Sequence, residues 1–386
     1  MSKTYQHAVS PDFPVDYWVE GDRAYVLKNK STDSTFAVGD EIISVNRVPA
    51  KDIIREAKAA QSRDGYGETF PYYFLNLYTF EDIAWRVFDV KPPYKFEIAH
   101  PDGRLTSHIV TRKPRPKNLN ASLPAIQKSD TEKKEEELKK SRRLEVLDSL
   151  PSTAILTVHG FGYEDAYEFH KQAFKGIAEK KIKSLIIDIR GNPGGNLLNA
   201  VDLMSYLTDT TFYVNRQSWA KLRNPNNPSF AQYFESSTKQ LLTDNTKFLY
   251  KKAGKYYFET GGMGPQQSKK ENIFKGKLYL LTGGFTFSAG ALFAAAVKEQ
   301  LEATFIGQET GGGQAGCSGG IIQTLTLPYT KLRVGFPLFR VLSVSGKPLK
   351  GRGVLPDYPI TYHWKEKSEG RDLELEMALE LIKKGD

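Results

Sequence analysis

The alternation of hydrophobic and polar residues divides the chain into two parts with different secondary structure. Residues 15–113 contain short runs rich in β-branched and aromatic residues, such as YWVE, AYVLKN, EIISVN and YKFEIA. Such runs are typical of strands, and turn residues such as Gly21 and Gly39 separate them. We therefore predict a mainly-β domain over residues 15–113, preceded by an N-terminal segment over residues 1–14.

The second part, residues 151–386, has the pattern of an α/β protein. Largely apolar runs at 153–158, 184–190 and 277–282 are expected for strands that are covered on both faces. Between the first two runs, residues 164–180 carry apolar side chains at helical spacing. Strands that alternate with helices predict a largely parallel sheet.

The two parts are joined by residues 114–150, which are polar and charged. The first half of this stretch lies within KPRPKNLNASLP, and the second half is the charged run DTEKKEEELKKSRRLEVL. This composition is typical of a solvated helix or a flexible linker. We therefore predict a charged connector here.

Composition excludes several classes of site and partner. The net charge is +9, but basic and acidic residues are mixed along the 386-residue chain and no nucleic-acid-binding motif occurs, so we do not expect nucleic-acid binding. The single cysteine, Cys317, excludes an internal disulfide and a cysteine-based zinc site. No metal-ligand spacing occurs, and no stretch approaches the roughly 20 apolar residues of a membrane span.

The motif with the clearest chemical meaning is LYLLTGGFTFSAGA at residues 278–291. An apolar strand ends in glycines, and Ser288 follows directly before a helix of small residues. This placement exposes the Ser288 hydroxyl at the positive end of a helix, where the N–H of Ala289 faces a developing oxyanion. Serine is also a common helix cap, so the spacing alone leaves nucleophile and cap as alternatives.

A second glycine-rich turn follows the apolar strand that ends near Asp188. In the run DIRGNPGGN, Gly194 and Gly195 supply amides that no side chain shields, as the second half of an oxyanion hole requires. The alternative is a simple turn into a helix over residues 197–207. A phosphate-binding loop is excluded because no Gly-Lys-Ser/Thr sequence occurs here.

Four motifs occur in the order found in the tail-specific protease and tricorn-core superfamily of serine peptidases, which the chain resembles over essentially its whole length. They are LIIDIRGNPGG (185–195), TFSAGA (286–291), IGQETGGG (306–313) and GRGVLPD (351–357). Ahead of them, VGDEIISVNR (38–47) and the helical stretch after it resemble a PDZ domain, with Arg47 in place of the usual glycine. A small β domain without a peptide groove is the alternative for this region.

The resemblance implies a crotonase-like (ClpP/crotonase-type) α/β peptidase core preceded by the PDZ-like domain. It implies a serine endopeptidase that needs no cofactor and no metal, with Ser288 as nucleophile and with Ala289, Gly194 and Gly195 as oxyanion donors. The expected reaction is hydrolysis of peptide bonds in extended or unfolded polypeptides through an acyl-enzyme. A PDZ-like groove would hold such substrates by strand addition.

The resemblance offers two kinds of general base. One branch of the superfamily uses a lysine, but the matching position here is Gly313, which excludes a Ser-Lys dyad of that kind. The tricorn-like branch uses a histidine ahead of the PDZ domain, which points to His7. The glutamate that assists it there would fall near residues 347–350, which contain none.

Three further residues enter as alternatives. His159 follows a strand and is a second candidate base, against the simpler interpretation of a hydrogen-bonded structural histidine. Glu309 either orients a base or stabilises the glycine loop around it, and we favour the loop. Cys317 lies in a glycine-rich loop without an adjacent base, which argues against a cysteine nucleophile.

Two functions other than proteolysis are the competing hypotheses. The missing lysine and glutamate favour a catalytically inactive peptide- or ligand-binding protein on the same fold. A crotonase-type acyl-CoA enzyme is disfavoured because a PDZ-like module has no role in it. The first residues lack the pattern of a signal peptide, and a periplasmic or extracellular location is expected only if an export signal once preceded them.

Overall fold

The computed structural model describes most of the chain. The described residues are 13–35, 37–111, 138, 140–221, 231–234, 249–258, 264–268 and 271–385. His7 and most of the predicted connector therefore lie outside them. No helix in the described ranges is long and apolar enough to cross a membrane.

The chain folds into two compact units, which we describe one at a time. The N-terminal unit comprises residues 1–62, 70–135 and 360–377. The C-terminal unit comprises residues 63–69, 136–359 and 378–386. Each unit is therefore built from segments that are far apart in the sequence.

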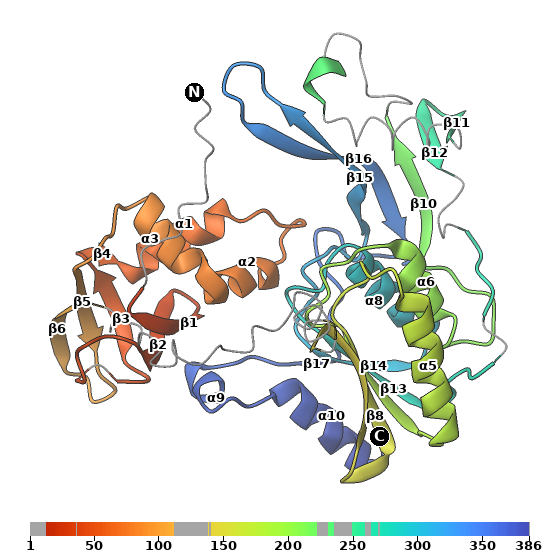
Figure 1. Cartoon of the computed structure of the whole chain (residues 1–386), viewed down its shortest axis with the longest axis horizontal. Coiled ribbons are helices and arrows are strands. Elements are labelled where there is room, and N and C mark those ends of the chain that lie inside the picture. Colours follow the sequence, from red (N-terminus) through yellow and green to blue (C-terminus); the bar gives the residue numbers. More distant parts are fainter. Residues whose placement is uncertain are drawn as a thin grey trace, which may run out of the picture. The chain divides into compact units, whose positions relative to one another are not determined.

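The N-terminal unit is an antiparallel sheet with helices packed against it (Figure 1). Its strands lie in the order β1-β2-β3-β5-β6, and β4 pairs with β3. Strand β1 alternates in exposure, so that Val15, Tyr17 and Val19 face the core. The elements are β1 (Val15–Glu20), β2 (Arg23–Asn29), β3 (Glu41–Val45), β4 (Val48–Pro49), α1 (Ala50–Ala60), α2 (Thr69–Phe74), the π-helical segment η1 (Leu75–Thr79), α3 (Phe80–Arg86), β5 (Tyr94–Ala99) and β6 (Leu105–Val110).

Aromatic rings fill the centre of this unit. The ring of Phe13 lies edge-on to four others, with centroid distances from 5.4 to 6.2 Å, and these belong to Tyr17, Phe80, Tyr94 and Phe96. Edge-on pairs of this kind add to the stabilisation that burial alone provides. The predicted mainly-β region thus has a hydrophobic core of its own.

A segment from the far end of the chain completes the N-terminal unit. Helix α9 (Trp364–Ser368) places the Trp364 ring against Tyr25 at a centroid distance of 6.2 Å, and the backbone N–H of Trp364 donates to the carboxylate of Glu20. The ring also lies against Gly39, where a Cβ atom would come within 2.5 Å of it. Residues 360–377 were predicted to belong to the C-terminal domain, because pattern alone does not show which surface a tryptophan will meet.

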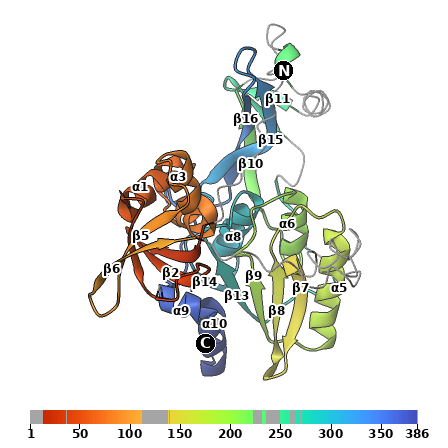
Figure 2. The ribbon, with the colours of Figure 1, turned by 60° about the vertical axis from the view of Figure 1, so that its left-hand side comes forward.

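The C-terminal unit contains the predicted α/β sheet. Its strands lie in the order β17-β14-β13-β9-β8-β7, and all neighbouring pairs except β7 and β8 are parallel. Helices α5 and α6 lie side by side along this sheet (Figure 2). The elements are β7 (Arg142–Leu147), β8 (Leu150–Val158), α5 (Ala166–Glu179), β9 (Ser184–Asp188), α6 (Leu197–Met204), β13 (Lys277–Thr282), α8 (Ala289–Gln300), β14 (Ala303–Gly307) and β17 (Tyr358–Pro359), with the part of α10 (Leu373–Lys384) that follows residue 377.

Strand β7 corrects the predicted connector. Residues 142–147 were assigned to a linker over 114–150, but they form an edge strand antiparallel to β8. None of the six side chains is fully buried, and those of Arg143 and Glu145 are exposed, so charged residues are tolerated on this edge strand. Arg142 at its start is bonded to the carboxylate of Asp165.

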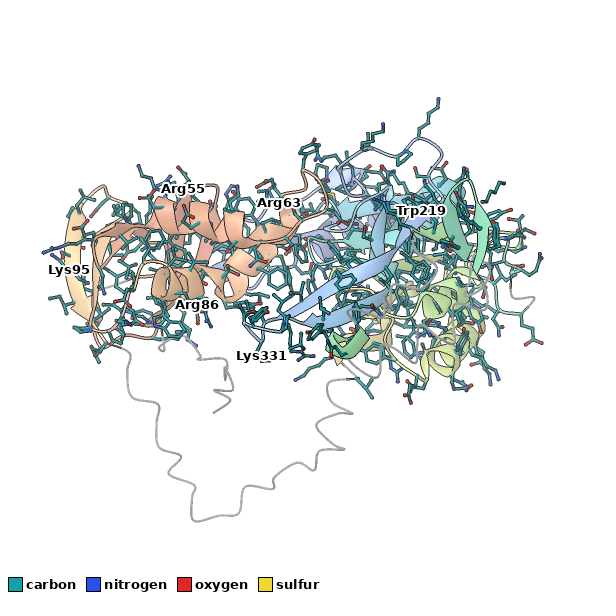
Figure 3. All side chains as sticks on the ribbon, turned by 90° about the horizontal axis from the view of Figure 1, so that it is seen from above. Arg55, Arg63, Arg86, Lys95, Trp219 and Lys331 are labelled. Carbon is teal, nitrogen blue, oxygen red and sulfur yellow. The ribbon has the colours of Figure 1, made fainter. Side chains whose placement is uncertain are left out.

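A second, antiparallel sheet of the C-terminal unit carries a long hairpin. Its strands lie in the order β11-β12-β10-β16-β15, and Figures 1 and 2 show β15 and β16 running outward from the α/β sheet. Trp219, labelled in Figure 3, lies on β10 with the ammonium of Lys255 at 3.9 Å from its ring centroid. The elements are β10 (Asn215–Ala220), the short 3₁₀ turn η2 (Ala231–Tyr233), β11 (Leu249–Lys252), β12 (Lys255–Phe258), β15 (Gly316–Thr326) and β16 (Arg333–Ser343).

A pair of glycine substitutions tests the packing of Trp364. Gly39 and Gly103 have similar backbone angles, φ +90° and +85°, but only Gly39 has atoms within 4 Å of an added Cβ. We expect Gly39→Ala to lower the free energy of unfolding by about 2 kcal/mol more than Gly103→Ala, since both variants carry the φ strain and one also carries the clash. Urea titration measures the difference, and equal losses would show that Trp364 does not rest on Gly39.

Candidate active site

Ser288 occupies the turn between strand β13 and helix α8 with a strained backbone. Its φ of 48° and ψ of −123° lie in a region that side chains other than glycine rarely adopt. Strain of this kind persists only where the surrounding structure enforces it, and it is typical of a nucleophile on a sharp strand-to-helix turn. The Ser288 side chain makes no capping hydrogen bond to α8. Ser288 thus stands at the N-cap position of α8, but its side chain does not cap the helix.

Two glycines allow the backbone to crowd around Ser288. A Cβ on Gly194 would lie 2.6 Å from the Ser288 Cβ, and a Cβ on Gly312 would lie 3.2 Å from the Ser288 nitrogen. Gly194 also has a φ of +107°. A larger residue at either position would displace Ser288. The glycines of the motifs at 185–195 and 306–313 therefore both make room for the turn that carries Ser288.

The side chain of Asn192 holds the backbone segments around Ser288 together through buried hydrogen bonds. It is completely buried, its Nδ2 donates to the Val158 carbonyl at 2.9 Å, and its Oδ1 accepts from the Gly194 N–H at 2.9 Å. The backbone carbonyl of Asn192 accepts from the N–H of Phe287, also at 2.9 Å. One residue thus joins the end of β8, the glycine turn and the residue before Ser288. Asn192 lies within the sequence motif at 185–195, but no role was predicted for it.

The three predicted oxyanion donors differ in whether their amides already have a hydrogen-bond partner. The amides of Ala289 and Gly195 have no hydrogen-bond partner among the described residues, and Gly195 is exposed. The Gly194 amide is bonded to Asn192 Oδ1 and is therefore not free to donate to an oxyanion. The reason is local, because the asparagine two residues earlier folds back onto that amide.

The two candidate bases differ in what the structure shows of them. His7 lies outside the described residues. His159 packs on Gly191 at the end of β8, with its Nε2 3.4 Å from Asp188 Oδ2. Asp188 also receives Arg190 Nη2 at 2.8 Å. Within the described ranges no contact links His159 to Ser288, and the buried His159 Nε2 has no hydrogen-bond partner there.

Asp188 is buried and remains charged. Burial alone raises the pKa of its carboxyl, but the contacts with His159 and Arg190 lower it more, so that the pKa lies well below its usual range. The carboxylate ties the ends of β8 and β9 to the turn at Arg190, whose own N–H it also accepts. Asp188 therefore stabilises the turn that leads to Gly194.

The surroundings of Cys317 and Glu309 agree with the simpler interpretation of each residue. Burial, with a smaller contribution from the charge of Asp64, raises the pKa of the Cys317 thiol to about 11, and the nearby Ser288 side chain acts weakly in the opposite direction. Cys317 is therefore a neutral thiol. Glu309 accepts from Arg352 Nε at 2.9 Å and from the Gly353 N–H at 2.6 Å, as expected for a residue that stabilises the glycine loop. In the described part of the chain, no group of three or more metal-ligating side chains converges.

Comparison with known proteins gives one family and a set of similar folds. The model of peptidase family S41 matches residues 152–360. A comparison with curated proteins finds no match.

Among solved structures, that of mature CPAF complexed with lactacystin aligns with a TM-score of 0.58 at 14% identity, over 96% of this chain and 82% of that chain. A structure of mature CPAF gives a TM-score of 0.56 at 15% identity, over 92% and 79%. A peptidase from Parabacteroides merdae gives 0.44 at 16% identity, over 87% and 89%. At these identities the CPAF likeness shows the fold alone.

Replacing the Asn192 side chain tests whether its hydrogen bonds hold this site together. Asn192→Ala leaves the Val158 carbonyl and the Gly194 amide without their buried partner, and we expect the free energy of unfolding to fall by about 2–4 kcal/mol. The control is Asn196→Ala, four residues on, which removes the exposed cap of α6 and should cost about 1 kcal/mol. Chemical denaturation measures both. If Asn192→Ala lowers the free energy of unfolding no more than Asn196→Ala does, the hydrogen bonds of Asn192 do not hold the site together.

The lowered pKa of Asp188 predicts a dependence of stability on pH. A carboxyl whose folded pKa lies below the unfolded value of about 4 adds stability above that pH, which is lost as pH falls toward the folded pKa. We expect Asp188→Asn to lower the free energy of unfolding by about 3 kcal/mol at pH 7. The gap between the two proteins should narrow between about pH 5 and pH 2. Urea titrations over this range measure it, and a constant gap would show that the charge is unimportant.

Proposed function

The chain belongs to peptidase family S41, and on that premise we propose that Ser288 is the nucleophile with which this serine peptidase cleaves peptide bonds. The observation that carries the proposal is the strained, partly exposed Ser288 between β13 and α8, whose side chain does not cap the helix. Strained backbone conformations of this kind cluster at active sites, and this one exposes a hydroxyl at the N-terminus of a helix, where a nucleophile is favoured.

The proposed reaction is acyl transfer in two steps. Ser288 Oγ attacks the peptide carbonyl carbon, its proton passes to a base, and the amine leaves with a proton from that base. Water then hydrolyses the acyl-enzyme and restores the serine. The free amides of Ala289 and Gly195 are suited to receive the oxyanion, while Gly194 shapes the turn through its missing side chain.

His7 is the base we propose for proton transfer. His159, the other candidate that the sequence offered, is already engaged by Asp188 and packed on Gly191. The lysine position of the related branch is Gly313, which has no side chain to offer. The proposal for His7 therefore rests on the resemblance of its sequence position and on the lack of any contact between His159 and Ser288 among the described residues.

The N-terminal unit is proposed as a PDZ-like domain that handles extended polypeptides, and the C-terminal unit as the crotonase-like core of a tail-specific peptidase. The turn at Gly39 leads into β3, and β4 and α1 follow, as the sequence resemblance requires. The edge of strand β1 is engaged at one point, because the Val19 N–H donates to Asn76 Oδ1 at 2.6 Å. Strand addition at this point would need Asn76 to move aside.

An inactive binding protein is the second candidate. The observation in its favour is that no described histidine or lysine contacts Ser288. In that case peptides would bind without being cleaved, and Ser288→Ala would leave binding unchanged.

Labelling with a fluorophosphonate probe distinguishes the two. We expect the full chain to be labelled and Ser288→Ala to lose the label, with hydrolysis of unfolded protein reduced by about 10³-fold or more. Ser368→Ala, an exposed serine on α9, should label normally. Loss of labelling in His7→Ala would identify the base, whereas normal labelling would exclude it. If the unaltered chain stays unlabelled, the binding protein is the better interpretation.

A further inference from the structure

The hairpin of strands β15 and β16 begins beside the nucleophile and ends far from it. An added Cβ on Gly312 would stand 3.2 Å from the Ser288 nitrogen. The next residue, Gly313, accepts at its carbonyl from the N–H of Gly316, the first residue of β15, at 3.1 Å. Each strand of the hairpin has 11 residues, which corresponds to roughly 35 Å at about 3.3 Å per residue. About ten residues of an extended polypeptide therefore span the distance from Ser288 to the far end of the hairpin.

The far end of the hairpin, residues 329–334, exposes apolar side chains, and we call it the hairpin tip. The exposed fractions are 95% for Tyr329, 59% for Leu332 and 41% for Val334. Lys331, labelled in Figure 3, lies between the first two of these in the sequence. Single exposed apolar residues are common on protein surfaces, but three of them within six residues at the end of a hairpin are typical of a binding surface.

Backbone bonds and one aromatic contact hold the hairpin in place. The Leu327 N–H donates to the Leu332 carbonyl at 2.8 Å, and the Lys331 N–H donates to the Leu327 carbonyl at 3.0 Å. Closer to the nucleophile, the ring of Phe234 lies 6.1 Å from that of Phe336 on β16. A surface that is already ordered loses little conformational entropy when a partner binds to it. The hairpin tip is therefore prepared for binding.

The sheet that carries the hairpin has charges of only one sign. Its five strands contain no aspartate or glutamate, and Lys331 adds a cation at the hairpin tip. In the sequence, no acidic residue occurs between Glu309 and Asp357. A surface of one sign attracts partners of the opposite sign, so the partner of this sheet is anionic. The cations of the five strands are Arg216, Lys251, Lys252, Lys255, Arg333 and Arg340.

We propose that the hairpin tip binds unfolded polypeptide substrates through their acidic and apolar residues, about ten residues from the peptide bond that is presented to Ser288. The inference rests on the proposed serine peptidase activity and names its substrate class. An unfolded polypeptide exposes apolar side chains that a folded protein buries, and an extended chain is long enough to reach both places. The charge would also suit an anionic membrane surface, but the polypeptide is favoured because β15 begins beside the nucleophile.

The length of the substrate tests this role of the hairpin tip. In a variant with Tyr329→Ser and Leu332→Ser, we expect the KM for casein, an acidic unfolded protein, to rise about 10-fold. The kcat should stay unchanged, because contacts far from the reacting bond are equally strong in the ground state and the transition state. A six-residue peptide spanning a cleavage site of casein is too short to reach the tip, so its kcat/KM should be unaltered.

Matched variants separate the hairpin tip from the rest of the surface. Leu105→Ser removes a leucine of β6 that is 74% exposed, and it should change neither constant. Lys331→Glu should raise the KM for casein about 5-fold at low salt, whereas Lys28→Glu, the same charge change at an exposed position of β2, should not. Casein whose carboxyl groups have been amidated should bind equally well to the unaltered chain and to Lys331→Glu or better to the latter.

Three outcomes would contradict the proposal. The first is an unchanged KM for casein in the Tyr329→Ser and Leu332→Ser variant, and the second is an equal loss with the six-residue peptide. The third is co-sedimentation with phosphatidylglycerol vesicles that the two substitutions abolish while the KM for casein stays the same, which would assign the tip to a membrane surface. Fluorophosphonate labelling of Ser288 should be normal in all of these variants. An unlabelled unaltered chain would overturn the serine chemistry instead, and a roughly 10-fold weaker binding of fluorescent casein would then still test the tip.

Discussion

The hydrogen bonds of Asn192 hold together the three segments on which the candidate site depends. This side chain joins the end of β8 to the Gly194 turn, and its carbonyl receives the amide of Phe287, one residue before the nucleophile. A second bridge lies beside it, since the Thr286 hydroxyl donates to the Ile189 carbonyl at 2.8 Å. The side chains of Asn192 and Thr286 are completely buried, so a broken bond would leave an unsatisfied polar group behind.

This bonding explains how a strained serine is maintained. A backbone such as that of Ser288 costs on the order of 1–3 kcal/mol, and it follows a strand, β13, that is buried between β9 and β14. Helix α8, which leads away from the serine, is buried along its first nine residues. The turn is therefore clamped at both ends, and neither end can shift to relieve the serine without breaking the core of the sheet.

The candidate site also gathers residues from segments that are remote in sequence. The glycine strip at 312–313 meets the turn of Ser288 on one side and the loop of residues 63–69 on the other. In the sequence, that loop lies between two segments of the N-terminal unit, whose core surrounds Phe13. Residues 360–377 also belong to the N-terminal unit, where Trp364 packs against Tyr25. Both units therefore contain segments that are far apart along the chain.

The sequence by itself determined those features that depend on short-range pattern. The apolar runs of β9 and β13, the glycines after them and the serine before α8 were all evident, because burial on both faces and a sharp turn each impose a composition on adjacent residues. Only the tertiary structure decided that Gly194 gives its amide to Asn192, that residues 142–147 form an edge strand, that Trp364 packs on Gly39 and that Asp64 meets Gly313. These are contacts of individual atoms, in most cases between segments that are far apart along the chain, and neither spacing nor composition records which surfaces come together when the core closes.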